Sequence, residues 1–214
     1  MRPTVFGYTA KMSAPTHSAT VLIIGGGAGG MSCAITLASA QDKPWFDDRR
    51  IIIIDDGTSD LRKARLFNAP GVEPGMLGED LLIRLEAQLH QYDSATTLPG
   101  TVQRAERLPN GKFIATLESG EEILAETLVL ATGYKRWDVE GLDHMPQQHP
   151  RGGKSNRIHL HHDGCYRIEP DLHVAGLLAG GSSQFAIAAG IGAQVAVELL
   201  SAWAGKRTHV HDTA

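Results

Sequence analysis

The sequence predicts an α/β fold in three layers: a central parallel sheet, helices packed on it, and a small antiparallel β-meander. An apolar, β-branched run at residues 20–24 precedes the glycine-rich run 25–30 and an Ala- and Leu-rich segment at 31–40, in the order strand, tight turn, helix. A second apolar run, 50–54, ends in two aspartates. Strand-like segments with Pro-Asn-Gly and Ser-Gly turn signals lie between residues 101 and 124 and predict the meander.

The remaining elements follow along the chain. Residues 58–74 carry the Pro, Gly and charged residues of a loop, and leucines at helical spacing predict an amphipathic helix at 78–92. Apolar runs at 127–131 and 172–175 predict two more buried strands, and a helix rich in small residues is expected at 183–203. Shorter strands are expected at 101–103, 112–117, 122–124 and 157–161.

These elements predict one domain over residues 20–203. Residues 1–19 are polar and lack the apolar core of a signal peptide, so we expect a mobile leader there and a short tail at 204–214. His, Gln, Pro and Gly gather at 143–156, which is typical of a linker or an exposed crossover.

Charge, cysteine content and hydropathy narrow the classes of protein. Lys and Arg number 20 and Asp and Glu 24, a net charge of −4, so neither nucleic acid nor an anionic membrane is an expected partner. The two cysteines, Cys33 and Cys165, form neither a disulfide framework nor a Cys-x-x-Cys zinc site, which favours a reducing cytoplasm. Glycines and polar residues interrupt the apolar stretch 172–200, so no membrane helix of about 18 residues is expected.

The glycine-rich run carries the strongest functional signal. Gly25, Gly27 and Gly30 match G-x-G-x-x-G between a predicted strand and a predicted helix, the context that predicts a Rossmann-like dinucleotide site. The helix N-terminus at Ala28 would bind the pyrophosphate, and Asp55 would accept hydrogen bonds from ribose hydroxyls. The motif does not separate NAD from FAD, and its alternative is a glycine-rich turn that binds nothing.

Four segments, the glycine run among them, occur in a specific order. Residues 21–32 contain the glycine run, 68–71 read Asn-Ala-Pro-Gly, 128–133 end in Ala-Thr-Gly, and 183–190 begin the last predicted helix. Together they resemble the FAD domain of low-molecular-weight thioredoxin reductases and related flavoprotein oxidoreductases. The resemblance covers residues 20–142 and 157–203.

This resemblance implies one bound FAD. The glycine turn would hold the pyrophosphate, Asp55 the adenosine ribose, and Thr132, Gly133 and Gln184 the flavin side. A helix N-terminus at 183–186 would stabilise the negative charge of a reduced flavin. No catalytic residue and no metal ligand is assigned. The candidate cofactor-binding set is Gly25, Gly27, Ala28, Gly30, Asp55, Asp56, Arg62, Asn68, Val102, Thr132, Gly133, Gly176, Gln184 and Ala186.

Departures from the family pattern shape the expected activity. The family inserts an NADPH domain between its FAD segments, whereas only residues 134–156 lie in that gap here, fewer than the roughly 30 of a βαβ unit. No second glycine motif and no Cys-x-x-Cys pair is present, and Leu177 stands where the family has the aspartate of Ala-Gly-Asp. We therefore do not expect a self-sufficient NADPH-dependent disulfide reductase.

The expected function is an FAD-dependent oxidoreductase that receives electrons from a small substrate, from free NAD(P)H or from a partner protein. Two alternatives stay open: a non-catalytic flavin-binding subunit or sensor, and an NAD-binding dehydrogenase with a lone Rossmann domain. A small-molecule or protein redox partner is expected, and a homodimer is a further expectation.

The cysteines, the basic residues after Asp56 and the segment 134–137 could also have functional roles, but each has a structural interpretation. Cys33 is expected to face the sheet as a small hydrophobic residue, and Cys165 to be an ordinary exposed thiol. Arg62 and its basic neighbours Lys63 and Arg65 either approach the pyrophosphate or lie in a solvated loop. Residues 134–137, Tyr-Lys-Arg-Trp, could cover the isoalloxazine or a partner surface.

Histidines cluster late in the chain. His159 and His161 would share one face of a short strand, with His162, His144 and His149 nearby. No acidic residue or cysteine completes a defined metal site, so a solvated edge strand or loop is the expected setting.

Overall fold

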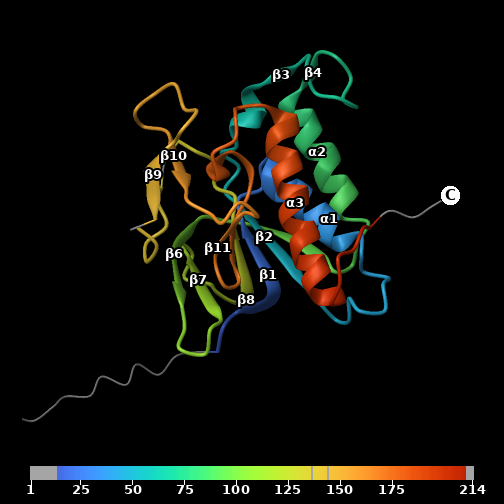
Figure 1. Ribbon diagram of the computed structural model, residues 1–214, viewed down its shortest axis with the longest axis vertical. Helices are drawn as coiled ribbons and strands as arrows, with labels where there is room; N and C mark the ends of the chain where they lie inside the picture. The colour runs from blue at the N-terminus through green and yellow to red at the C-terminus, as the bar shows by residue number, and fades with distance from the viewer. Residues whose placement is uncertain (1–13, 136, 144, 211–214) are drawn as a thin grey trace, which may run out of the picture.

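The parallel strands form the middle layer of the protein (Figure 1). The computed structural model describes residues 14–135, 137–143 and 145–210. The strand order in the sheet is β11-β12-β8-β1-β2-β5, and all neighbours are parallel except β11 and β12. The strands are β1 (His17–Ile24), β2 (Ile51–Asp55), β5 (Ala95–Pro99), β8 (Glu122–Leu130), β11 (Arg167–Glu169) and β12 (Leu172–Val174).

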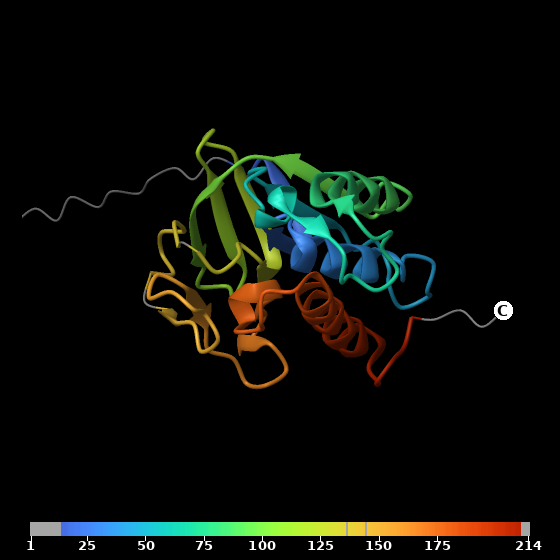
Figure 2. The ribbon, with the colours of Figure 1, turned by 90° about the horizontal axis from the view of Figure 1, so that it is seen from above.

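The helices cover one face of this sheet (Figures 1 and 2). They are α1 (Ala28–Ala38), α2 (Gly78–Leu89) and α3 (Phe185–Ala204), and α1 packs against both of the others. Alternate residues of the strands, including Ile23 and Val129, point toward them and share their core.

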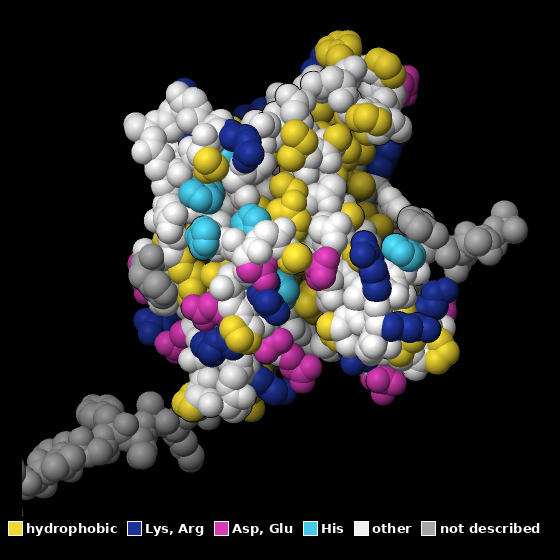
Figure 3. All heavy atoms as spheres, in the orientation of Figure 1, with side chains coloured by type: hydrophobic (Ala, Val, Ile, Leu, Met, Phe, Trp, Pro, Cys, Tyr) yellow, Lys and Arg dark blue, Asp and Glu magenta, His cyan; other side chains and the backbone are white. Residues whose placement is uncertain are grey.

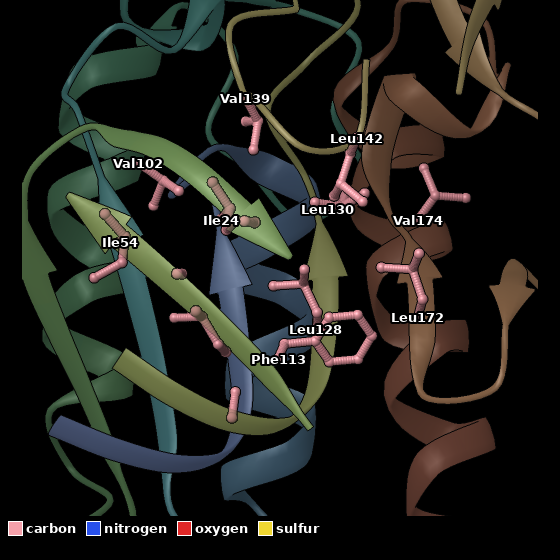
Figure 4. Packing of buried hydrophobic residues seen from close by; sticks show 14 of the residues in the cluster. Ile24, Ile54, Val102, Phe113, Leu128, Leu130, Val139, Leu142, Leu172 and Val174 are labelled. Atoms are coloured by element: carbon pink, nitrogen blue, oxygen red, sulfur yellow. The ribbon is translucent and has the colours of Figure 1, made fainter. Parts of the chain in front are cut away.

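The opposite face carries the antiparallel meander. β6 (Val102–Arg107) pairs with β7 (Phe113–Leu117), and β7 pairs with β8. Leu128 and Leu130 of β8 pack on this side with Phe113, as Figure 4 shows. Because both faces of the parallel strands are buried, their sequences are continuous apolar runs, and the predicted three-layer fold is confirmed.

Strand β8 corrects one prediction. Residues 122–124 and 127–131 were expected to form separate strands, but Glu122–Leu130 is continuous. Its first half pairs antiparallel with β7 and its second half parallel with β12, while β1 runs beside both halves. No Gly or Pro interrupts residues 125–126, and the exposed Glu126 pairs with Lys112, so the backbone has no reason to turn there.

Two strands extend or add to the expected set. β1 begins at His17, so the last residues of the predicted leader belong to the sheet, whereas residues 1–13 lie outside the described residues. β5 was not predicted at all. It is a short edge strand of Ala-Thr-Thr-Leu-Pro, whose partly exposed polar residues hide the apolar pattern on which strand prediction depends.

The regions expected to be loop or linker contain short elements. The turn η1 (Asp60–Lys63) and the ladder β3 (Arg65–Leu66) with β4 (Met76–Leu77) lie before α2. β9 (Pro146–Gln148) lies in the predicted linker and pairs with β10 (Ile158–Leu160), which confirms the strand expected at 157–161; this hairpin stands apart from the helices in Figure 1. A further turn, η2 (Gly176–Ala179), joins β12 to α3.

Helix α3 confirms the helix expected at 183–203 but differs from the expectation that no helix is apolar enough to cross a membrane. Its glycines do not break it, and an 18-residue window of this 20-residue helix reaches a mean hydropathy of 1.7, enough by length and composition to cross a membrane. Core helices meet the same criterion, and Val195 and Leu199 of α3 are buried in the core shared with α1.

Candidate cofactor site

A cleft of about 600 Å³ opens where β1, β2 and β8 end. Its volume lies in the range of roughly 300–1,000 Å³ that is typical of small-molecule sites. The segments that follow these three strands line it, together with η2 and the N-terminus of α3. Carboxyl ends of parallel strands meet at one edge of an α/β sheet, which is where such folds bind their ligands.

The glycine turn has the geometry that its motif requires. Gly25 has φ +110°, and a Cβ there would lie 2.4 Å from the carbonyl oxygen of Ala131. A Cβ on Gly30 would lie 1.9 Å from the carbonyl oxygen of Gly25. The first glycine therefore permits the turn and the last permits the helix to pack on the strand, as the pattern predicts.

Two helix N-termini face this cleft. α1 begins after Gly27 and α3 after Gln184, and both residues belong to the lining. No side chain among the described residues caps either terminus, and neither first turn contains an acidic residue. The backbone amides and the helix dipoles therefore favour a ligand that carries negative charge.

The acid after β2 lies against the glycine turn. Asp55 Oδ1 accepts a hydrogen bond from the backbone N–H of Gly26 at 3.2 Å, and Asp55 Oδ2 lies 3.8 Å from Arg62 Nη2. Asp56 accepts two hydrogen bonds from Thr58, at 2.9 Å from its N–H and 2.7 Å from its hydroxyl. Of the two acids, Asp55 is the one directed at the glycine turn, while Asp56 stabilises the loop after β2.

The other end of the cleft is built from segments far apart in the chain. Asn68 Nδ2 donates a hydrogen bond to Gln184 Oε1 at 2.7 Å across 116 residues of sequence. Between them in sequence, Thr132 follows β8, and its buried hydroxyl has no hydrogen-bond partner among the described residues. A buried hydroxyl without a partner is costly, so this atom points to a ligand that supplies one.

The structure brings most of the candidate set together. Gly30 packs beneath the turn, and Ala186 is exposed outside the lining. Arg62 is also absent from the lining, because its guanidinium reaches Glu79 at 3.3 Å; its neighbours Lys63 and Arg65 line the cleft instead. The candidates that line the cleft are Gly25, Gly27, Ala28, Asp55, Asp56, Asn68, Val102, Thr132, Gly133, Gly176 and Gln184.

Some lining residues were missed by the sequence analysis. Ser59 and Asp60 lie in η1 or at its N-cap, and Asp60 forms an ion pair with Lys135 from the far side of the cleft. The signal for Ser59 is its residue type, because serine is a preferred helix N-cap. In the structure its hydroxyl accepts a hydrogen bond from Leu61 N–H, as an N-cap does. The pairing of Asp60 with Lys135 has no local signal.

The segment after the Ala-Thr-Gly strand divides in two. Tyr134 and Lys135 line the cleft, in keeping with a covering role. Trp137 instead packs against the meander-side core, because the chain turns back onto the sheet there. Arg136 lies outside the described residues.

Neither cysteine is placed for redox chemistry at the cleft. Cys33 is fully buried in the helix-side core, and burial raises the pKa of its thiol to about 12. Cys165 is exposed and does not line the cleft. Both placements agree with the sequence interpretation of ordinary thiols.

The histidines were expected to be solvated, and the structure corrects this for His149. His149 is only 4% exposed and hydrogen-bonds to the backbone, because the hairpin folds back onto η2. His159 lies in β10, whereas His161 is exposed beyond its end, so they do not share a strand face. His144 lies outside the described residues. Within the described ranges, no group of three or more His, Cys, Asp or Glu could hold a metal ion.

Fold and site together define an α/β domain with a Rossmann-like glycine turn and the three-layer arrangement of a flavoprotein FAD domain. The chain belongs to the pyridine nucleotide-disulphide oxidoreductase family, whose sequence model matches residues 19–197. This family binds FAD.

Solved structures share the fold. A thioredoxin reductase from Gloeobacter violaceus superposes with a TM-score of 0.73 at 15% identity, covering 92% of this chain and 99% of that one. The Lactococcus lactis thioredoxin reductase gives 0.66 at 13% identity (87% and 99% covered). A ferredoxin-flavin thioredoxin reductase from Clostridium acetobutylicum gives 0.65 at 13% identity (88% and 98% covered). The fold is that of low-molecular-weight thioredoxin reductases.

One curated relative is similar over a shorter stretch. A ferredoxin--NADP reductase from Flavobacterium psychrophilum is 34% identical over 71 residues. The match covers 33% of this chain and 20% of that protein, so it spans one fifth of the length of this relative.

Proposed function

We propose that this chain is an FAD-dependent oxidoreductase domain whose flavin receives electrons from a separate donor. The observation that carries the proposal is the cleft itself. It joins the glycine turn, Asp55 and two uncapped helix N-termini at one edge of the sheet, in a chain whose family binds FAD. The flavin supplies hydride or one-electron chemistry when bound.

The lining residues fit such a cofactor in two parts. The amides at the start of α1 would bind the pyrophosphate, and Asp55 would accept hydrogen bonds from the adenosine ribose. At the other end, the buried hydroxyl of Thr132 would form a hydrogen bond with the ligand. The N-terminus of α3 would stabilise negative charge on the flavin ring.

The segment between β8 and β12 supports an external donor. Where the family carries an NADPH domain, the described part of this segment forms the β9–β10 hairpin. Residues 145–162 include Arg151, Lys154 and Arg157 but no Asp or Glu, although the chain as a whole carries −4. Figure 3 shows basic and histidine side chains over β9 and β10, with acidic ones gathered lower on this face.

This charge distribution favours an acidic redox protein as the donor, since complementary charge steers association. The names of two similar proteins agree with such a donor. The Flavobacterium relative is a ferredoxin--NADP reductase and the Clostridium structure a ferredoxin-flavin thioredoxin reductase.

The test begins with the absorption spectrum of the purified chain, followed by anaerobic titration with NADH, NADPH and a photoreduced acidic ferredoxin. We expect a flavin spectrum that the ferredoxin bleaches fastest, with a rate that falls as salt rises. Lys154→Glu should slow the reaction with ferredoxin and leave reduction by dithionite unchanged. A colourless protein that takes up no FAD would refute the proposal.

A second candidate is a flavin-binding subunit without turnover of its own. It is favoured by the absence of any thiol from the cleft lining among the described residues. A yellow protein that dithionite bleaches, but that no nucleotide or ferredoxin reduces, would support this candidate. A colourless protein that binds NAD would instead indicate a lone Rossmann dehydrogenase.

A further inference from the structure

The η2 turn connects β12 to α3 at the flavin end of the cleft. Gly176 and Leu177 of this turn line the cleft, and so do Ser183 and Gln184 just before α3. The position of the turn therefore sets both the cleft wall and the N-terminus of the helix that follows.

Three side chains hold the backbone of this turn. His149 Nε2 lies 3.1 Å from the carbonyl oxygen of Leu177, and His162 Nε2 lies 3.2 Å from that of Ala179. Arg151 Nη1 donates to the carbonyl oxygen of Gly180 at 2.8 Å. All three come from residues 149–162, the hairpin and the segment directly after it.

Neighbouring backbone N–H groups select the same tautomer for both imidazoles. The N–H of Arg151 donates to His149 Nδ1, and the N–H of Gly164 donates to His162 Nδ1, each at 3.1 Å. A ring nitrogen that accepts carries no hydrogen, so the hydrogen that each ring donates stands on Nε2. Both rings therefore donate to the carbonyls of the turn.

His149 also reaches a second wall of the cleft. Its ring packs edge-on against the ring of Tyr134, with centroids 5.4 Å apart, and Tyr134 lines the cleft. The side chain is buried, and burial lowers its pKa, which favours the neutral donor. One side chain thus joins the segment after β8 to the segment before α3.

We infer that His149 is a positioning residue for the flavin: with Arg151 and His162 it clamps η2, and so fixes the N-terminus of α3 at the flavin end of the cleft. This inference rests on the proposed FAD site. The β9–β10 hairpin, which lies where the family has its NADPH domain, would then have the role of holding η2 at the proposed flavin site.

The test compares His149→Ala, His149→Gln and His161→Ala. Gln can both donate to Leu177 and accept from Arg151, and His161 is exposed beyond β10, which makes it the matched control. We expect His149→Ala to weaken FAD binding to the apoprotein by about tenfold, the loss of one buried hydrogen bond. It should also lower the flavin midpoint potential, because the helix N-terminus no longer holds its place against the ring. His149→Gln should recover most of both, and His161→Ala should match the wild type.

Amide hydrogen exchange of the apoprotein measures how firmly these side chains hold η2, and it needs no cofactor. His149→Ala should speed exchange at residues 176–185, whereas His161→Ala should not. If the wild type takes up no FAD but this difference appears, the proposed function fails and the clamp stands. Unchanged exchange, affinity and potential in His149→Ala would overturn the inference. The inference would also be overturned if His149→Ala lowered the melting temperature of the apoprotein enough to explain the changes in affinity, potential and exchange, and if His149→Gln did not restore them.

Discussion

The two ends of the cleft are built in different ways. At the end near Asp55, the groups come from consecutive elements, β1, the glycine turn, α1 and β2, and the parallel register of β1 with β2 aligns them. At the other end, Asn68, Thr132 and Gln184 converge from loops over 116 residues of sequence, and the hairpin holds η2 from outside. The first end is specified by local sequence and the second by tertiary packing, so they should respond differently to mutation.

The largest effect is expected at the local end. Gly30→Val places a side chain where even a Cβ lies 1.9 Å from the Gly25 carbonyl oxygen, so α1 must separate from β1. We expect destabilisation of about 3 kcal/mol or more and loss of bound FAD, measured by urea unfolding and by the flavin spectrum.

Gly190 offers the control for this change. It lies in α3, and a Cβ there meets no described atom within 4 Å apart from its chain neighbours and the local helix backbone. Gly190→Ala should retain FAD and raise stability by up to about 1 kcal/mol. Retention of full FAD binding in Gly30→Val would contradict the assignment of the turn.

The neighbouring acids Asp55 and Asp56 should differ in their effect on FAD binding. Asp55→Asn removes the charge that would face the ribose and should weaken FAD binding by about ten- to a hundredfold. Asp56→Asn should have a smaller effect, because Thr58 already occupies its Oδ1. Fluorescence titration of the apoprotein with FAD measures both. Equal losses in the two variants would mean that Asp55 has no special role.

Acid should destabilise the protein through a histidine away from the cleft. His173 of β12 is buried, desolvation is the main cause that lowers its pKa, and its Nδ1 lacks a hydrogen-bond partner among the described residues. Below about pH 6.5 the unfolded imidazole binds a proton while the folded one stays neutral, so the free energy of unfolding falls as pH falls.

His173→Leu removes this titration. Urea unfolding between pH 5 and pH 8 should show a flatter acid limb in the variant than in the wild type. The exposed His161→Leu should leave the slope unchanged. An identical slope in His173→Leu would show that His173 does not carry the acid sensitivity.

The smallest effect is expected at Cys165. The exposed thiol lies outside the cleft lining, so Cys165→Ser should leave the flavin spectrum and reduction rates within experimental error. Wild type and variant should both show little or no reduction of a disulfide reagent by NADPH. Sustained NADPH-dependent turnover that Cys165→Ser abolishes would refute this prediction.

The same division explains how much the sequence could predict. The strands, glycine turn and first helix at residues 20–40 and 50–55 were correctly predicted because each leaves a pattern within a few residues. β5 was not predicted because an edge strand with one exposed and one partly buried threonine lacks that pattern. The burial of His149 and the pairing of Lys135 with Asp60 were not predicted. Their partners are distant in sequence and come near only in the folded chain.

Strand β8 has a mechanical consequence. Its backbone continues without a break from the meander into the parallel sheet, and β1 is hydrogen-bonded beside it almost throughout. The meander therefore cannot rotate against the parallel strands without disrupting that ladder, and the cleft wall that contains Val102 is anchored to the central sheet through β7 and β8.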